Sequence, residues 1–130
     1  MGREYNGVRD LSSVRSRKKG TETAIGAFCP RFHRAVELVG GRWTGAIIRM
    51  LLGGSLRFSE LASAVPGMSD RLLAQRLKEL ESEGIVRRTV DDGPPVRVAY
   101  SLTAAGEELE STIRSLGTWA ERWIPMGAKH

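Results

Sequence analysis

Apolar side chains recur at three- and four-residue intervals in several segments of this chain, which is the spacing of one face of an α-helix. Gly40-Gly41, Gly53-Gly54 and Pro66-Gly67 interrupt these segments, and such pairs end helices or form turns. The pattern predicts five helices: at about 30–39, at about 42–52, a brief one capped by Ser59, a fourth that begins at Ser69, and one at about 104–123.

Two β-branched segments, Ile85–Val90 and Val96–Leu102, follow the fourth helix. The acidic, turn-forming segment Asp91–Pro95 connects them, which predicts a β-hairpin. A short extended piece at Leu56–Phe58 precedes the third helix. The fold is therefore predicted to be mainly α with a small β-hairpin (α+β), in the order helix, helix, short strand, helix, helix, strand, strand, helix. That order is typical of a winged helix-turn-helix, which places one helix in the major groove of DNA.

The fourth helix has one apolar face and one polar face. Leu73, Leu77 and Leu80 repeat at +4 and +3 and form the face expected in the core. Arg76 falls at the edge of that face. On an isolated helix the opposite face would most often only be solvated, but the turn before and the hairpin after favour a recognition helix. The polar side chains on it are Arg71, Gln75, Lys78 and Ser82.

In a recognition helix these side chains have chemical partners on DNA. Arg pairs bidentately with guanine and Gln with adenine, so Arg71 and Gln75 are the candidates for contacts with base edges. Lys78 lies further along the helix and suits a phosphate. Ser69 and the free amides of the first turn suit another phosphate, because the N-terminal end of a helix attracts anions.

Three arginines outside this helix are further candidates for DNA contacts. Arg97 adjoins the tip of the hairpin and would contact phosphate or the minor groove, although Asp91 and Asp92 there repel the DNA backbone. Arg42 and Arg57 would contact flanking phosphates. Ordinary surface charge accounts for these last two equally well.

A stripe of apolar residues follows the last helix. A long terminal helix of this kind needs a partner surface, and in so small a chain a second copy would supply it. The residues of the stripe are Leu109, Ile113, Leu116, Trp119, Ala120 and Trp123.

Length and charge define the expected organisation. The 130 residues suit one domain, and no apolar run approaches the ~20 residues of a membrane span. Of the net charge of +5, residues 1–20 carry +4 from six basic and two acidic side chains, which leaves +1 for residues 21–130. We expect a basic arm at 1–26, either a disordered leader or a contact to the DNA backbone, a DNA-binding and dimerisation domain at 27–126, and a short tail at 127–130.

The remaining chemistry is sparse. The N-terminal segment lacks the apolar core of a secretory signal, and a single cysteine allows no intramolecular disulfide, so we expect a cytoplasmic protein with no role in a membrane. Metal-spaced Cys/His sets, nucleophile elbows and phosphate loops do not occur. The sequence therefore predicts no metal, no cofactor and no enzymatic activity.

The single cysteine, Cys29, stands at the start of the first helix. The positive end of a helix and the nearby Arg31 and Arg34 stabilise a thiolate, whereas Phe28 and Phe32 would oppose it if they bury the thiol. A reactive sensing thiol and an inert small hydrophobe both stay open.

Several motifs in this order resemble the HxlR-type, MarR-like winged helix-turn-helix regulators of bacteria. The resemblance covers about residues 29–123, and the basic extension, residues 1–26, lies outside its pattern. The motifs are Cys29-Pro30, Glu37–Thr44, Arg57–Leu61, Pro66–Ser69, Leu73–Glu81, Gly84–Val86 and Val98–Gly106.

The resemblance implies a homodimeric, sequence-specific transcription regulator whose first and last helices, Phe32 among them, form the dimer. Its two recognition helices would lie ~34 Å apart on a near-palindromic operator in double-stranded DNA. Some members sense oxidants or electrophiles through a cysteine at the position of Cys29, so a repressor that responds to these or to another small effector is expected. The nearly neutral body favours an alternative, a winged-helix protein–protein interaction module without a DNA role.

Overall fold

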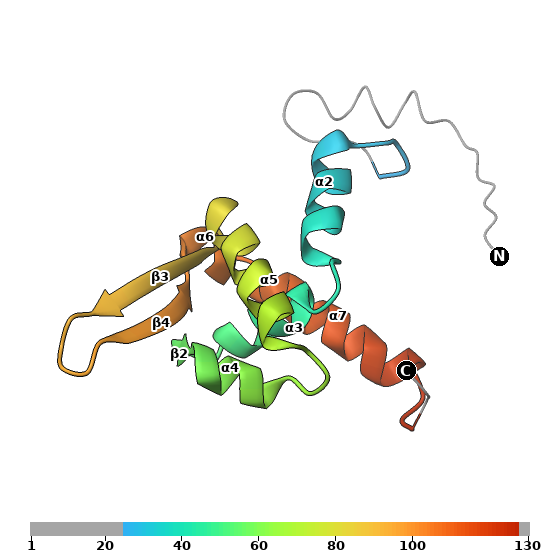
Figure 1. The fold of residues 1–130 in the computed structure, drawn as a ribbon. Coiled ribbons are helices and arrows are strands. Elements are labelled where there is room, and N and C mark those ends of the chain that lie inside the picture. The colour runs from blue at the N-terminus through green and yellow to red at the C-terminus, as the bar shows by residue number, and fades with distance from the viewer. Residues whose placement is uncertain (1–24, 128–130) are drawn as a thin grey trace. The chain divides into compact units, whose positions relative to one another are not determined.

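The computed structural model describes residues 25–127 (Figure 1). They divide into two compact units between Leu38 and Val39. Nearly all of the expected N-terminal arm and the last three residues of the expected tail lie outside the described residues. In the first unit the chain forms α2 (Pro30–Val39), whose last residue is the first of the second unit, and this helix has the predicted bounds.

The second unit has the predicted order of elements, and the mainly α fold with a small antiparallel sheet is confirmed. Its β-hairpin projects away from the helices (Figure 1). In chain order the elements are α3 (Thr44–Leu51), β2 (Leu56–Arg57), α4 (Phe58–Ala64), α5 (Asp70–Ser82), β3 (Val86–Asp91), β4 (Arg97–Leu102), α6 (Ala104–Glu107) and α7 (Glu110–Trp123).

The core of the second unit is built from α3, α4, α5 and the start of β3. One apolar face of each of these helices loses contact with water, and each fully buried side chain contributes roughly 1.5–3 kcal/mol to the free energy of unfolding. The fully buried residues are Ile47, Ile48, Leu51, Leu61, Leu73, Leu77, Leu80 and Val86.

The sheet has three antiparallel strands in the order β2-β4-β3. The predicted extended piece is β2, and it pairs with β4 so that Leu56 lies opposite Tyr100. In the hairpin Val86 lies opposite Leu102 at the inner end and Asp91 lies opposite Arg97 at the tip. The strand order places the start of the helix-turn-helix directly beside the hairpin.

Both ends of α5 are closed by the residues that the sequence indicates. Ser69 is the N-cap, and its side-chain oxygen accepts a hydrogen bond from the Leu72 amide at 3.1 Å. At the other end Gly84 has a φ of +79°, a conformation that costs glycine little. The Ile85 amide then donates to the Leu80 carbonyl at 2.9 Å, which closes the last turn.

Thr103 joins the end of α5 to the start of α6. Its hydroxyl lies 2.6 Å from the Gly84 carbonyl oxygen and 3.2 Å from that of Ile85, and its amide donates to Ile85 at 2.9 Å. The Gly106 amide donates to the Thr103 hydroxyl oxygen at 3.2 Å, so Thr103 is also the predicted N-cap of α6.

The predicted single helix at 104–123 is wrong in one respect, because the structure divides it into α6 and α7. A Cβ at Gly106 would lie 2.5 Å from the Ile85 carbonyl oxygen, so the backbone of α6 is pressed against the start of the hairpin. The Leu109 amide bonds the Gly106 carbonyl three residues back at 3.0 Å, and this tighter turn precedes α7.

Two helix starts also differ from the prediction. Ser59 is not a cap but lies inside α4, whose N-cap is Arg57. The Arg57 amide donates to the side chain of Glu60 at 2.7 Å, so the acidic residue at the third position fixes the start. Helix α3 begins two residues later than expected, because Trp43 has a φ of +72° and cannot continue a helix.

Trp43 is the described non-glycine residue with a positive φ, a conformation that is unfavourable for a bulky side chain. Its ring lies 3.5 Å from the position that a Cβ would take at Gly67, in the turn between α4 and α5. Gly67 itself has a φ of +87°. Trp43 is thus the last residue of the α2–α3 connection. Its backbone is strained, and its ring packs over the turn between α4 and α5.

In the part of the chain that the structure describes, no helix has both the length and the apolar character needed to cross a membrane.

The contact at Gly106 gives a prediction for stability. We expect Gly106→Ala to lower the free energy of unfolding by about 1–3 kcal/mol, because the new methyl group meets backbone that cannot move aside. Urea unfolding at a fixed protein concentration measures the change.

The control is Gly117→Ala in α7, where a Cβ would meet only the mobile end of the Arg49 side chain, at 3.0 Å. We expect this variant to be as stable as the parent, or more stable by up to about 1 kcal/mol, because alanine favours a helix. Equal stability of Gly106→Ala and the parent would show that the close approach is not a constraint.

Candidate DNA-binding surface

Helix α5 presents its polar face to solvent because its apolar face is fully used in the core. Leu73, Leu77 and Leu80 are at most 1% exposed. Three predicted DNA contacts lie exposed on the other side and are called here the recognition face: Arg71, Gln75 and Lys78. Burial therefore fixes which side chains of α5 can meet a ligand outside the protein.

The N-terminal end of α5 can bind an anion. Ser69 is exposed, and its oxygen already accepts the Leu72 amide, which leaves the hydroxyl proton available for a phosphate oxygen. Asp70 in the first turn stabilises the helix but repels an anion at the same place. The two effects oppose each other at any anion that meets Ser69.

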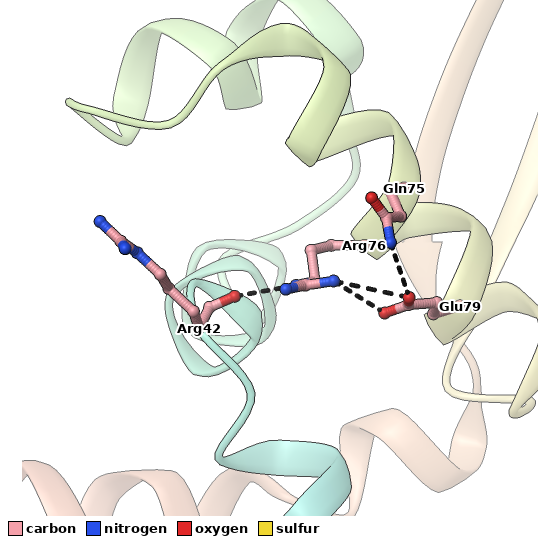
Figure 2. Close-up of polar contacts among 4 residues, drawn as sticks. All are labelled: Arg42, Gln75, Arg76 and Glu79. Carbon is pink, nitrogen blue, oxygen red and sulfur yellow. Dashed lines mark hydrogen bonds and ion pairs between the residues drawn. The ribbon is translucent and has the colours of Figure 1, made fainter.

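Gln75 is held by a neighbour on its own helix. Its Nε2 donates to Oε2 of Glu79 at 3.4 Å, and Nη1 of Arg76 lies 3.2 Å from Oε1 of the same carboxylate. Arg76 also donates through Nε to the backbone carbonyl of Arg42 at 3.0 Å (Figure 2). The sequence pattern places Arg76 at the edge of the apolar face but indicates no partner for it.

The hairpin carries Arg97 at its tip, exposed and opposite Asp91. Asp91 uses Oδ1 to accept the Gly93 amide at 3.3 Å, which shapes the turn. No ion pair between Asp91 and Arg97 occurs in the described structure, so the guanidinium is not neutralised by its cross-strand neighbour. Val90 and Val96 beside it are 47% and 66% exposed.

Arg42 and Arg57 are both exposed, the first just before α3 and the second in β2. The guanidinium of Arg42 lies 5.3 Å from the centre of the Trp43 ring, within the range of a cation–π contact. In Figure 2 this guanidinium points away from Arg76. Both arginines can therefore reach a phosphate without breaking an ion pair.

Several cations on this surface have no ion-pair partner. Within residues 25–127, no ion pair joins Arg71, Lys78 or Arg97 to a carboxylate, whereas Arg114 on α7 is bound to Glu110 at 2.8 Å. An unpaired cation can neutralise a phosphate and release its counterion. This local arrangement matters more than the total charge, which is only +1 for residues 21–130.

The predicted interface stripe on α7 separates into buried and exposed residues. Ile113 is 6% exposed and belongs to the core of the single chain, and Leu109 is half-buried. Leu116, Trp119 and Trp123 are 58%, 54% and 64% exposed. In the first unit, Phe32 on α2 is 68% exposed.

Cys29 is half-buried and stands just before α2. The Phe32 amide donates to its sulfur at 3.4 Å, so the sulfur occupies the place of an N-cap acceptor. Such an amide favours a thiolate over a thiol.

A groove of about 450 Å³ lies between α3 and α7. Arg49 and Arg114 line it together with Glu110 and Glu121, so its charge is balanced. Among residues 25–127 no group of three or more His, Cys, Asp or Glu side chains could hold a metal ion.

Comparisons with known proteins agree with this arrangement. The family model of the HxlR-like helix-turn-helix matches residues 38–128. An uncharacterised HTH-type regulator of Bacillus subtilis, YvaP, is 48% identical over 96 residues, 74% of this chain and 89% of that protein. The HTH-type transcriptional regulator YodB of the same organism is 40% identical over 99 residues, 76% of this chain and 88% of that protein.

Two solved structures are also similar. The reduced form of YodB from B. subtilis has a TM-score of 0.70 at 39% identity and covers 78% of this chain and 100% of its own. The redox regulator HypR in its oxidised form has a TM-score of 0.70 at 34% identity and covers 75% of this chain and 100% of its own. With an exposed recognition face on α5 beside a β-hairpin wing, the chain belongs to the HxlR-like helix-turn-helix family of DNA-binding transcriptional regulators.

Proposed function

We propose that the protein is a homodimer that binds a near-palindromic operator and places one α5 in each of two successive major grooves. The observation that supports this most is the exposed recognition face of α5, opposite a face that is at most 1% exposed. A regulator of this kind acts in the cytoplasm and without catalysis. Family membership favours DNA binding over the protein–protein module.

Each residue of the recognition face has a distinct role in the proposal. Arg71 pairs with guanine and Gln75 with adenine in the major groove. Lys78 and Ser69 contact phosphates and fix the register of the helix on the duplex. Arg97, Arg42 and Arg57 would contact the flanking backbone; they add affinity but no base preference.

Exposed apolar side chains support the dimer. Leu116, Trp119 and Trp123 are more than half exposed, and an apolar group of this size on a terminal helix marks an interface. A two-fold interface brings the same helix from two copies together and repeats α5 at one turn of DNA, ~34 Å. Phe32 on α2 is the expected contribution of the first unit.

The family's redox chemistry supports a role for Cys29. The solved structures of YodB include a diamide-treated and a quinone-bound form, and HypR is named a redox regulator. We infer that oxidants or electrophiles regulate this protein as well. Each chain has one thiol, so diamide would take two electrons and two protons from two protomers' thiols to form one disulfide, whereas a quinone would add to a single thiol.

The base contacts give the first prediction for DNA binding. We expect Arg71→Ala and Gln75→Ala each to lose about tenfold or more of the discrimination between the operator and single-base variants at one position per half-site. Lys78→Ala should weaken binding to all sequences alike and reduce the slope of log K against log salt by about 1.

Fluorescence anisotropy with a set of operator variants at several salt concentrations measures both effects. Arg114→Ala on α7 is the control, because it removes the same charge away from the recognition face. If Arg71→Ala and Gln75→Ala both keep full discrimination, the recognition face is assigned wrongly.

The dimer gives a second prediction. The double variant Leu116→Asp/Trp119→Asp should be monomeric at micromolar concentration and bind the operator about 100-fold more weakly, because one half-site alone remains. Sedimentation equilibrium and anisotropy measure the two quantities. Thr118→Asp adds one negative charge, half of that in the double variant, on the side of α7 that lines the α3 groove, and it should stay dimeric. A dimeric double variant would contradict this interface.

The thiol gives a third prediction. Cys29→Ser should bind the operator like the parent and should no longer respond to diamide or a quinone, because serine keeps a cap acceptor but forms neither adduct. Anisotropy with and without oxidant, followed by reductant, measures the response, and mass spectrometry identifies the adduct. Parent protein that keeps its operator affinity after oxidant treatment would rule out this regulation.

A further inference from the structure

Figure 2 shows a continuous set of polar contacts between the recognition face and the connection that precedes α3, residues 40–43. We call this connection the junction. The contacts run from Gln75 to Glu79, from Glu79 to Arg76, and from Arg76 to the backbone of Arg42. Gln75 is proposed to touch DNA, whereas Arg76 lies on the protein side of the helix.

Arg76 uses two edges of its guanidinium for two different purposes. Its Nε donates to the Arg42 carbonyl at 3.0 Å, and its Nη1 lies 3.2 Å from Oε1 and 3.5 Å from Oε2 of Glu79. The side chain is 20% exposed, so water competes less for these contacts than at an exposed pair. The planar guanidinium can make both sets of bonds at once, which a lysine ammonium cannot do in the same geometry.

Glu79 transfers this constraint to Gln75. Its Oε2 accepts one Nε2 hydrogen of Gln75 at 3.4 Å. The second Nε2 hydrogen and Oε1 of Gln75 stay available, and these are the donor and acceptor that pair with N7 and N6 of adenine. The bond to Glu79 therefore selects one of the two orientations of the carboxamide before DNA arrives.

The junction is in turn fixed by Trp43. The backbone of Trp43 has a φ of +72°, and its ring packs over Gly67 in the turn before α5. The Thr44 amide donates to the Gly41 carbonyl at 3.0 Å and closes the turn around Arg42. The Arg42 carbonyl that Arg76 binds therefore belongs to the junction, and the Trp43 ring of the same junction contacts the turn between α4 and α5.

We propose that Arg76 is a positioning residue for base recognition. It anchors α5 to the junction, holds Glu79 in place, and thereby fixes the orientation in which Gln75 meets a base. Base preference at the Gln75 position then depends on a residue that does not touch DNA. This inference rests on the proposed role of Gln75, and the experiment separates the two.

The experiment compares Arg76→Ala, Glu79→Ala and Gln75→Ala in the full-length dimer, with Lys78→Ala as a neighbouring control. Anisotropy against operator variants gives the discrimination at each base pair. We expect Arg76→Ala and Glu79→Ala each to lose about tenfold at the base pair that Gln75→Ala affects, and to keep discrimination elsewhere. In the Gln75→Ala background, neither Arg76→Ala nor Glu79→Ala should reduce the discrimination at that base pair further, because both act through the Gln75 side chain.

Nuclear magnetic resonance of the free protein gives a readout that needs no DNA. Both Arg76→Ala and Glu79→Ala should shift the side-chain amide signals of Gln75, but only Arg76→Ala should shift the backbone amides of residues 42–44. Arg76→Lys should not restore discrimination, because a single ammonium cannot reach the carbonyl and the carboxylate in the geometry of the guanidinium. Glu79 is exposed and alanine favours a helix, so Glu79→Ala decides the question even if Arg76→Ala does not fold.

Full discrimination in the Arg76 and Glu79 variants, with loss in Gln75→Ala, would overturn the inference and leave the proposed function standing. Full discrimination in Gln75→Ala would overturn both. An additional loss in the double variants would also overturn the inference, because Arg76 would then act on α5 as a whole.

Discussion

The burial of three leucines on one side of α5 fixes the rotation of this helix about its axis. Leu73, Leu77 and Leu80 leave no room for another orientation, because turning the helix would expose apolar area and bury charge. This rotation determines which side chains of α5 are exposed on the candidate DNA-binding surface. The side chains at 71, 75 and 78 face outward for this reason, and the polar groups at 76 and 79 are brought to the flank.

The ends of α5 matter as much as its rotation. The Ser69 cap fixes where the helix begins relative to the turn, and the glycine at 84 fixes where the chain leaves it for the wing. Because β2 pairs with β4, the strand that enters the helix-turn-helix also holds the hairpin. The recognition helix and the wing are therefore placed by the same small set of backbone hydrogen bonds.

Much of this could be predicted from sequence, because the determinants are local. Periodicity identified the faces of α5, and Ser69 and Gly84 marked its ends. The rest depends on contacts between distant residues. The bond from Arg76 to the Arg42 carbonyl spans 34 positions, and the division of the last helix depends on the fit of Gly106 against Ile85. The strained backbone at Trp43 cannot be seen in the sequence pattern, because the pattern would more readily assign a positive φ to Gly40, Gly41 or Gly45.

Thr103 has a mechanical consequence. Its hydroxyl and amide donate to the carbonyls of Gly84 and Ile85, which closely follow α5, and its side chain caps the start of α6. The end of α5, the hairpin and the start of α6 therefore meet at Thr103, and its hydrogen bonds leave them little freedom to move relative to one another. A tilt of the C-terminal helices would reach the end of the recognition helix through hydrogen bonds shorter than 3.3 Å instead of being absorbed by a flexible loop.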